Sequence, residues 1–167
     1  MALTPQELLA RLDALGIPYK NHTHPPLFTV ADSKVLRGEL PGGHCKSLFL
    51  KDKGGELFLV VALEDRKIDL KRLAKTIARG NFSFGSPELL KEMLGVTPGA
   101  VTPFGLVNDT DGKVRAVLDK KMLEHDPLNY HPLTNDQTTA VSPAGLLKFL
   151  EACGHPPRIF DFDRELV

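Results

Sequence analysis

The sequence predicts a mixed α/β (α+β) domain, in which helices surround a central mixed sheet. Short runs rich in β-branched and aromatic residues are joined both by tight turns and by helical stretches. This mixture of hairpins and helical crossovers argues against a doubly wound Rossmann fold. The 167 residues contain no internal repeat, low-complexity tract or linker, so we expect a single domain over residues 1–167.

Three helices share one N-terminal signal, a hydroxyl residue at the N-cap followed by proline. The pairs are Thr4-Pro5, Ser86-Pro87 and Ser142-Pro143. A glycine follows each expected helix, which therefore ends by Leu15, Leu94 and Cys153 respectively. Two further helices are expected, one from Val30 to Leu36 with Thr29 as N-cap, and one formed by the segment Arg66 to Arg79.

Eight strands are expected from apolar runs bounded by turn residues. They are Tyr19 to His24, Cys45 to Leu50, Glu56 to Leu63, Val101 to Asn108, Val114 to Leu118, Leu128 to His131, Thr138 to Val141 and Arg158 to Asp161. The turns Lys53-Gly54-Gly55 and Asp109-Thr110-Asp111-Gly112 each predict a hairpin.

Composition restricts the function classes. Formal net charge is zero, which argues against a protein that coats long nucleic acid. No apolar run approaches the roughly 20 residues of a membrane span, and no secretory signal precedes the domain. We therefore expect a cytoplasmic protein with no membrane or DNA partner. Cys45 and Cys153 are interpreted as free thiols, with one disulfide as the alternative.

Local charge is nevertheless organised. Lys67, Lys71, Lys75 and Arg79 recur at every fourth position of the segment Arg66 to Arg79. On a helix they would form one basic ridge, opposite an apolar face. Like charges at this spacing repel each other by a few tenths of a kcal/mol per pair. An RNA-binding surface and an ordinary solvated helix face are the two interpretations.

Lys46 is the first candidate for chemistry, because it stands between the Pro41-Gly42-Gly43 turn and an apolar strand. A cation on a rigid element beside a loop suits an anionic or ester ligand, whereas the ordinary alternative is a lysine reaching solvent from a strand end. Cys45 is expected on the opposite face, in the core, because neighbouring strand residues alternate.

Two other segments could join Lys46. The Gly/Pro-rich turn from Gly95 to Gly105 could offer backbone N–H groups to an oxyanion, and His131 ends a predicted strand. The alternative for the Gly95 to Gly105 segment is an ordinary loop whose glycines and prolines only set the turns. The alternative for His131 is a histidine with a purely structural role. No Gly-x-Ser-x-Gly, Walker or dinucleotide motif is present, and His22 and His24 lack a metal-binding partner motif.

An ordered set of segments resembles the YbaK/ProRS-associated editing-domain superfamily. The segments are His24-Pro25-Pro26, Cys45 to Asp52, Phe82 to Leu90, Leu94 to Asp109 and His131-Pro132-Leu133-Thr134-Asn135. Within this superfamily the chain is most similar to the free-standing prolyl-tRNA editing proteins. The resemblance extends from about Thr4 to Phe162, and it implies a barrel-like mixed sheet surrounded by helices.

The resemblance implies an aminoacyl-tRNA deacylase that hydrolyses alanine from mischarged tRNA(Pro) without a metal or cofactor. It assigns catalytic roles to Lys46 and His131. From its charge, the basic ridge is expected to contact the acceptor-stem backbone. The substrate-binding residues that it implies are Gly95, Pro98, Gly99, Ala100, Phe104 and Gly105. Prolyl-tRNA synthetase is a further partner that the family suggests.

One position departs from the family pattern. Asn81 stands where relatives carry an arginine before the Phe82 segment, which leaves base-specific reading of the acceptor stem open. Other small aminoacyl groups, such as cysteinyl, are the alternative substrates. A non-catalytic module that binds tRNA or a synthetase is the alternative of another class.

Overall fold

The computed structural model describes residues 2–27, 35 and 40–166. The helix predicted from Val30 to Leu36 with its cap Thr29 falls, apart from Val35, outside the described residues. Eight strands of the described part form one mixed sheet in the order β1-β7-β6-β2-β3-β5-β8, and β4 pairs with β2. The mixed α/β class predicted from the sequence is confirmed.

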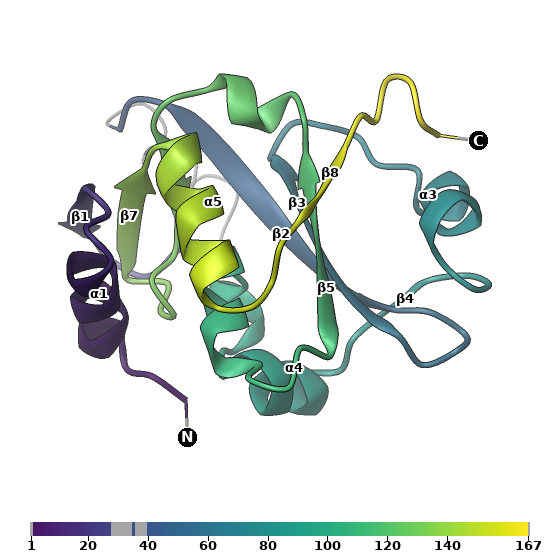
Figure 1. Cartoon of the computed structure of the whole chain (residues 1–167), viewed down its shortest axis with the longest axis horizontal. Helices are drawn as coiled ribbons and strands as arrows, with labels where there is room; N and C mark the ends of the chain where they lie inside the picture. Colours follow the sequence, from purple (N-terminus) through teal and green to yellow (C-terminus); the bar gives the residue numbers. More distant parts are fainter. Residues whose placement is uncertain (1, 28–34, 36–39, 167) are drawn as a thin grey trace.

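The strands are short except for β2, which crosses the molecule diagonally (Figure 1). Their bounds are β1 Tyr19–Thr23, β2 Gly43–Lys51, β3 Leu57–Leu63, β4 Ser83–Phe84, β5 Val114–Asp119, β6 Leu128–Tyr130, β7 Gln137–Val141 and β8 Arg158–Phe160. The pairs β2/β6, β3/β5 and β5/β8 are parallel, whereas β1/β7, β6/β7, β2/β3 and β2/β4 are antiparallel. Because β2 pairs with β6 near its start and with β3 and β4 further on, it connects both halves of the sheet.

The three helices with a hydroxyl-proline start form as predicted. They are α1 (Pro5–Ala14), α4 (Pro87–Leu94) and α5 (Pro143–Ala152). Thr4 and Glu7 form a complete capping box, in which each side chain accepts from the other residue's backbone N–H, at 3.2 and 2.9 Å. Gly95 ends α4 at φ +70°, a conformation that favours glycine.

The basic segment forms a shorter helix than predicted. α3 spans only Leu70–Ile77, because the side chain of Asp69 caps its N-terminus and Ala78 leaves the helical conformation at φ −126°. Lys67 and Arg79 therefore lie outside the helix. The backbone N–H of Arg79 instead donates to Oδ2 of Asp52 at 3.0 Å.

The prediction of a strand from Val101 to Asn108 is wrong. This segment forms a 3₁₀ helix, η2 (Pro103–Asn108), after a shorter one, η1 (Pro98–Ala100). Thr102 caps η2 and Pro103 occupies its first turn, so local capping overrides the apolar pattern. The Asp109 to Gly112 turn consequently joins η2 to β5 rather than two strands. The sequence also did not predict β4 or the 3₁₀ helix η3 (Met122–Glu124).

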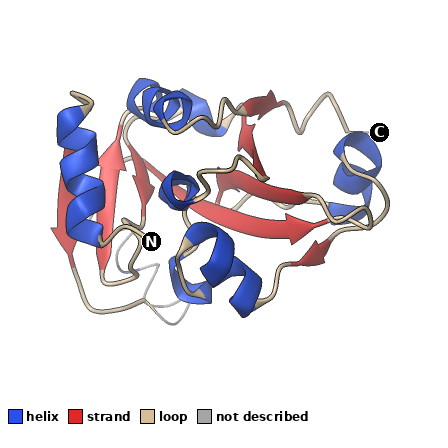
Figure 2. Ribbon diagram, turned by 60° about the horizontal axis from the view of Figure 1, so that its bottom comes forward, coloured by secondary structure: helices blue, strands red, loops and turns tan. Residues whose placement is uncertain are grey.

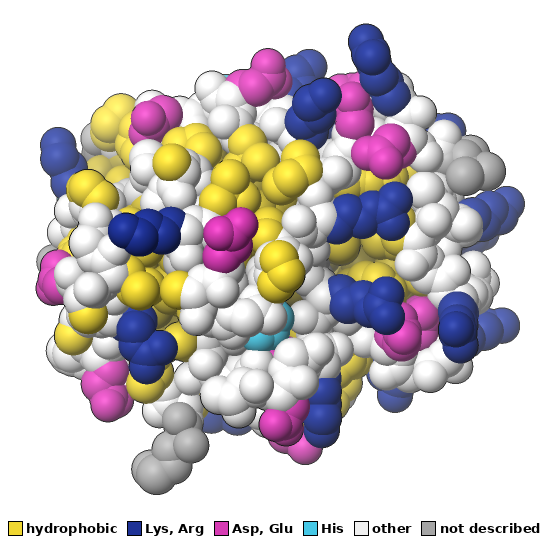
Figure 3. Space-filling model, in the orientation of Figure 1, with side chains coloured by type: hydrophobic (Ala, Val, Ile, Leu, Met, Phe, Trp, Pro, Cys, Tyr) yellow, Lys and Arg dark blue, Asp and Glu magenta, His cyan; other side chains and the backbone are white. Residues whose placement is uncertain are grey.

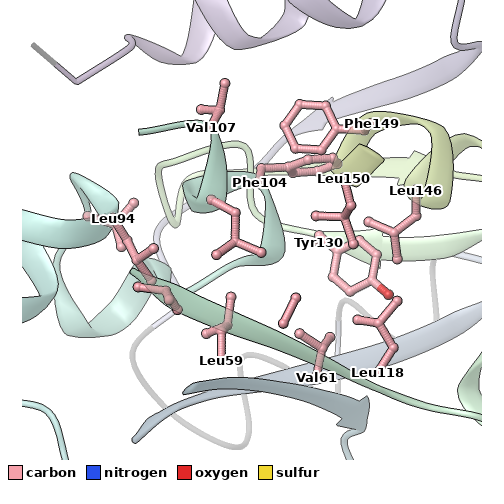
Figure 4. Close-up of a cluster of buried hydrophobic side chains, with 14 of the residues drawn as sticks. Leu59, Val61, Leu94, Phe104, Val107, Leu118, Tyr130, Leu146, Phe149 and Leu150 are labelled. Carbon is pink, nitrogen blue, oxygen red and sulfur yellow. The ribbon is translucent and has the colours of Figure 1, made fainter. Parts of the chain in front are cut away.

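Helices cover both sides of the sheet and enclose two apolar clusters (Figure 2). The larger cluster joins the sheet to α1, α4, η2 and α5, and Phe104 packs edge-on against Phe149 and Tyr130 at centroid distances of 5.3 and 5.9 Å (Figure 4). The smaller cluster joins Leu50, Phe58 and Val60 to Leu73 of α3. Within the described residues, no helix is both long and apolar enough to span a membrane.

Candidate functional site

A small cavity of about 80 Å³ opens where β2, β6 and β7 meet. Its lining residues are Leu27, His44, Cys45, Ser47, Glu64, Val101, Asn129, Tyr130, His131 and Thr138. Parallel pairing of His44 with Asn129 brings the start of β2 beside β6, and antiparallel pairing of β6 with β7 adds Thr138. Segments distant in sequence thus supply one site.

Three residues of β2 line the cavity, namely His44 near the start of the strand and then Cys45 and Ser47. Lys46, between Cys45 and Ser47, points to the other face of the strand. There Nζ of Lys46 donates to the backbone carbonyl of Arg66. The structure therefore separates Lys46 from the cavity lining.

The carbonyl that holds Lys46 belongs to an anchored loop residue. Nε of Arg66 lies 2.9 Å from Oδ2 of the buried Asp119, and its guanidinium lies 3.4 Å from the carboxylate of Asp163. The same guanidinium lies over the ring of Phe162, 5.3 Å from its centroid. These contacts tie the loop after β3 to the segment after β8.

His131 follows β6 directly and lines the cavity. Its Nδ1 lies 2.9 Å from the carbonyl oxygen of Gln137, and because a carbonyl only accepts, Nδ1 carries the hydrogen. Burial lowers the pKa of His131, and the nearby His24 lowers it further, although the bond to Gln137 opposes this shift. His131 is therefore neutral at pH 7, with Nε2 unprotonated.

His24 and Thr138 extend the polar side of the cavity. The rings of His24 and His131 are 6.4 Å apart between centroids. Nε2 of His24 lies 2.8 Å from Oγ1 of Thr138, and its Nδ1 lies 2.8 Å from the carbonyl oxygen of Pro25. The motif His24-Pro25-Pro26 thus supports a cavity residue.

Cys45 lies on the face of β2 opposite Lys46, as predicted, and it also borders the cavity. Its side chain packs partly against the larger apolar cluster. Burial raises the pKa of its thiol to about 12. The side chain is thus a neutral, compact part of the cavity wall rather than a thiolate nucleophile.

The Gly/Pro-rich segment contributes Val101 to the lining, and the six residues predicted to bind substrate lie around it rather than in it. Phe104, Gly105 and Ala100 are buried in the core, and Gly95 ends α4. Pro98 and Gly99 are exposed, and a Cβ on Gly99 would approach Nδ2 of Asn135 to 3.1 Å. That amide lies 3.5 Å from the carbonyl oxygen of Leu27, so Gly99 adjoins the cavity rim.

The four residues of the basic ridge are exposed. Lys71 and Lys75 lie on α3, and Lys67 and Arg79 flank it. Dark blue side chains are frequent on the right-hand half of Figure 3, the side on which α3 lies in Figure 1. α3 covers the face of β2 that carries Leu50, which is also the face of Lys46.

Sequence reasoning missed most of the cavity lining. Ser47, Glu64, Val101, Asn129 and Thr138 were not singled out. Because side chains alternate along a strand, Ser47 could have been predicted to share the face of Cys45. The other residues come together only once the chain is folded. Cys45 and Cys153 are free thiols. Across the described ranges, no three His, Cys, Asp or Glu side chains are grouped to hold a metal ion.

With this geometry in view, comparisons with known proteins identify the family. The family model of the aminoacyl-tRNA editing domain matches residues 24–149. The chain belongs to this family. The chain is also 41% identical over 162 residues to prolyl-tRNA synthetase associated domain-containing protein 1 of Mus musculus, covering 94% of this chain and 95% of that protein.

Other members of the editing-domain family agree with this match. The prolyl-tRNA editing protein ProX of Acetoanaerobium sticklandii is 38% identical over 151 residues, covering 90% of this chain and 92% of that protein. A crystal structure described as a candidate trans-editing enzyme for prolyl-tRNA synthetase aligns with a TM-score of 0.73 at 21% identity, over 96% of this chain and 98% of that one. This structural likeness confirms the predicted editing fold.

Proposed function

We propose that this editing-domain protein is a trans-acting deacylase that hydrolyses alanine from mischarged tRNA(Pro). The observation that carries the proposal is the cavity of about 80 Å³ that His131, Cys45 and Ser47 line in a chain of this family. One water needs about 10–15 Å³ on this scale, so the cavity suits a group of few heavy atoms. An alanyl group is such a group.

The proposed selectivity is by size. A synthetase pocket built for proline distinguishes a smaller amino acid by only about 1–3 kcal/mol per missing methylene, so alanine is sometimes attached. A second site that is too small for proline corrects this error. The cavity wall formed by Cys45, Val101 and Tyr130 would set this limit.

The reaction is a hydrolysis. A water oxygen attacks the ester carbonyl carbon, the bond from that carbon to the ribose oxygen breaks, and the ribose oxygen takes a proton. Free alanine and an uncharged tRNA 3′ end result. Because an aminoacyl ester is labile, positioning of the ester would supply much of the rate. The neutral thiol of Cys45 has no nucleophilic task in this scheme.

Lys46 and the basic ridge are proposed to hold the RNA. Lys46 lies on the face of β2 that α3 covers, outside the cavity lining, and in this proposal it would contact a terminal phosphate rather than the ester. Lys67, Lys71, Lys75 and Arg79 would meet the acceptor-stem backbone. The tRNA end would then pass around the start of β2 into the cavity. Prolyl-tRNA synthetase is a proposed partner, and the cytoplasm is the proposed location.

A deacylation assay tests this function. Purified protein is incubated in parallel with alanyl-, cysteinyl-, seryl- and prolyl-tRNA(Pro), and hydrolysis is compared with the protein-free rate of each ester. We expect rapid loss of alanine and none of proline. Preference for cysteine or serine would reassign the substrate, whereas tRNA binding without hydrolysis would indicate a binding module.

Variants of β2 test the proposed contribution of Lys46. Lys46→Ala should lower deacylation by raising KM, because it removes a phosphate contact. Lys51→Ala is the matched control, since Lys51 is an exposed lysine at the far end of the same strand. Unchanged kinetics in Lys46→Ala would remove this residue from the site.

A further inference from the structure

The side-chain hydrogen-bond donors around the cavity are largely engaged within the protein. Nδ2 of Asn129 donates to the carbonyl oxygens of Pro41 and Gly43, at 3.0 and 3.1 Å. The thiol of Cys45 points to the carbonyl of Gly43 at 3.8 Å, and the hydroxyl of Tyr130 donates to a methionine sulfur at 3.3 Å. These groups cannot also donate to a ligand.

The lining histidines follow the same pattern. Nδ1–H of His131 donates to the carbonyl of Gln137. Nε2 of His44 lies 3.0 Å from the carbonyl oxygen of Leu40, so that nitrogen carries the hydrogen. When such a ring is neutral, its second nitrogen is an acceptor. For His131 this second nitrogen, Nε2, has no partner among the described residues.

Acceptors therefore predominate among the polar side-chain atoms that line the cavity. The two bonds to Nδ2 fix the orientation of the Asn129 amide, since the opposite orientation would place oxygen against two carbonyls. Its Oδ1 is consequently an acceptor with no partner in the described part of the chain, but it is buried too deeply to contact a ligand in the cavity. Glu64 adds a carboxylate to the lining. Among the lining side chains, only the hydroxyl of Ser47 keeps a donor for which the described residues show no partner.

A cavity rich in acceptors attracts a ligand that brings donors. An anionic group would meet the Glu64 carboxylate and lone pairs, and its desolvation would find no compensation. An α-ammonium group carries three N–H donors and a positive charge, and charge-assisted hydrogen bonds are roughly twice as strong as neutral ones. The ester carbonyl itself gains little from acceptors.

We propose that the cavity recognises the free α-ammonium group of the aminoacyl ester, with Nε2 of His131 as its principal acceptor. This inference rests on the proposed deacylase function and adds a requirement to it. The protein would select its ester substrate by the positive charge of the aminoacyl group as well as by the size of that group. His131 would then be a positioning residue that fixes the ester relative to the attacking water.

The sharpest probe is lactyl-tRNA(Pro), in which a hydroxyl replaces the α-amino group of alanine at nearly the same size. The rate constant kcat/KM is measured for both esters, and each is divided by the protein-free hydrolysis rate of that ester. This normalisation removes the intrinsic effect of the ammonium group on ester lability. We expect the normalised value for the alanyl ester to exceed that for the lactyl ester by at least about tenfold.

Two variants of His131 test whether this residue causes the preference for the alanyl over the lactyl ester. His131→Leu removes the acceptor and should reduce the alanyl/lactyl ratio towards one. His131→Gln keeps an amide oxygen as acceptor and should retain much of the ratio. Thermal unfolding of each variant confirms that it is folded, and the wild-type ratio is informative without either variant.

The outcomes separate this inference from the proposed function. Hydrolysis of both esters at equal normalised rates by the wild type would overturn the ammonium proposal while leaving the deacylase intact. A wild-type ratio that persists in folded His131→Leu would also overturn it, because another group would then read the charge. Failure to hydrolyse any tRNA ester would overturn the proposed function, and the inference with it.

Discussion

Nε2 of His155 lies 2.9 Å from Oδ2 of Asp109, and both side chains are almost completely buried. The same carboxylate oxygen accepts the backbone N–H of Val114 at 2.7 Å, and Nδ1 of His155 lies 3.2 Å from the carbonyl of Cys153. This pair joins the end of η2, the start of β5 and the turn after α5.

Removal of this carboxylate should destabilise the fold. Asp109→Ala leaves a buried imidazole N–H and a backbone N–H without their acceptor, which costs about 1–3 kcal/mol for each unsatisfied group. Urea unfolding measures the change in the free energy of unfolding. Asp111→Ala, at an exposed position in the same turn, should change it little. Equal midpoints for the two variants would contradict the structural importance of the pair.

His131 should make stability dependent on pH. Burial holds its folded pKa below the ordinary value of 6.5, so the unfolded chain takes up a proton first as pH falls. The free energy of unfolding should therefore be unaffected by this residue above pH 6.5 and decline below it, through the folded pKa. Urea unfolding across this range should show a smaller acid decline in His131→Gln than in wild type.

The exposed His125 provides the control for this titration. His125→Gln should retain the acid decline of the wild type, because it replaces an exposed side chain and leaves the buried ring of His131 in place. If His131→Gln and wild type lost stability in parallel below pH 6.5, the buried neutral form assigned to His131 would be wrong.

Cys45 should limit the size of the acyl group. Cys45→Ala removes a sulfur atom from the cavity wall, so a 2-aminobutyryl ester, one methylene larger than alanyl, should gain access. We expect the preference for alanyl over 2-aminobutyryl tRNA to narrow by about tenfold. Cys153→Ala is the control, since Cys153 is a partly buried thiol at the end of α5. Loss of alanyl hydrolysis in folded Cys45→Ala would instead make the thiol part of the chemistry.

The basic ridge should contribute to tRNA binding through charge. Substitution of Lys71 and Lys75 by glutamine should weaken binding and make the dependence of log Kd on log salt less steep by about 2, if each lysine contacts one phosphate. Filter binding at several salt concentrations provides this slope. Lys20→Gln with Lys148→Gln removes the same charge from β1 and α5. Identical slopes in the two double variants would exclude the ridge as the RNA surface.

Local signals explain why much of the fold was predictable. The hydroxyl-proline starts of α1, α4 and α5 and the hairpin turn at Gly54-Gly55 depend on neighbouring residues only. The prediction was wrong at residues 101–108, where the apolar run reflects complete burial rather than strand alternation. It also extended α3 beyond Asp69 and Ala78, because regular spacing of lysines does not show where a helix is capped.

The site was less accessible to sequence reasoning. Strand alternation correctly separated Cys45 from Lys46, but it could not show that the face of Cys45 borders a cavity. That property arises from the pairing of β2 with β6 and from Val101, which a distant segment supplies. His131 was a candidate from its place at the end of a predicted strand, and the family resemblance supported it, whereas Asn129 and Thr138 are recognisable only once their hydrogen-bond partners are in place.

The two faces of β2 have a consequence for how the gene can change. Deletion or insertion of one codon that shifts residues 45–47 by one position in the strand ladder would turn Lys46 towards the cavity and Cys45 and Ser47 towards the face that α3 covers, since neighbouring side chains alternate. Such a frame-preserving indel would exchange the two proposed surfaces at once. Length variation should instead be tolerated at the Gly54-Gly55 turn, where added residues leave the strand ladder intact.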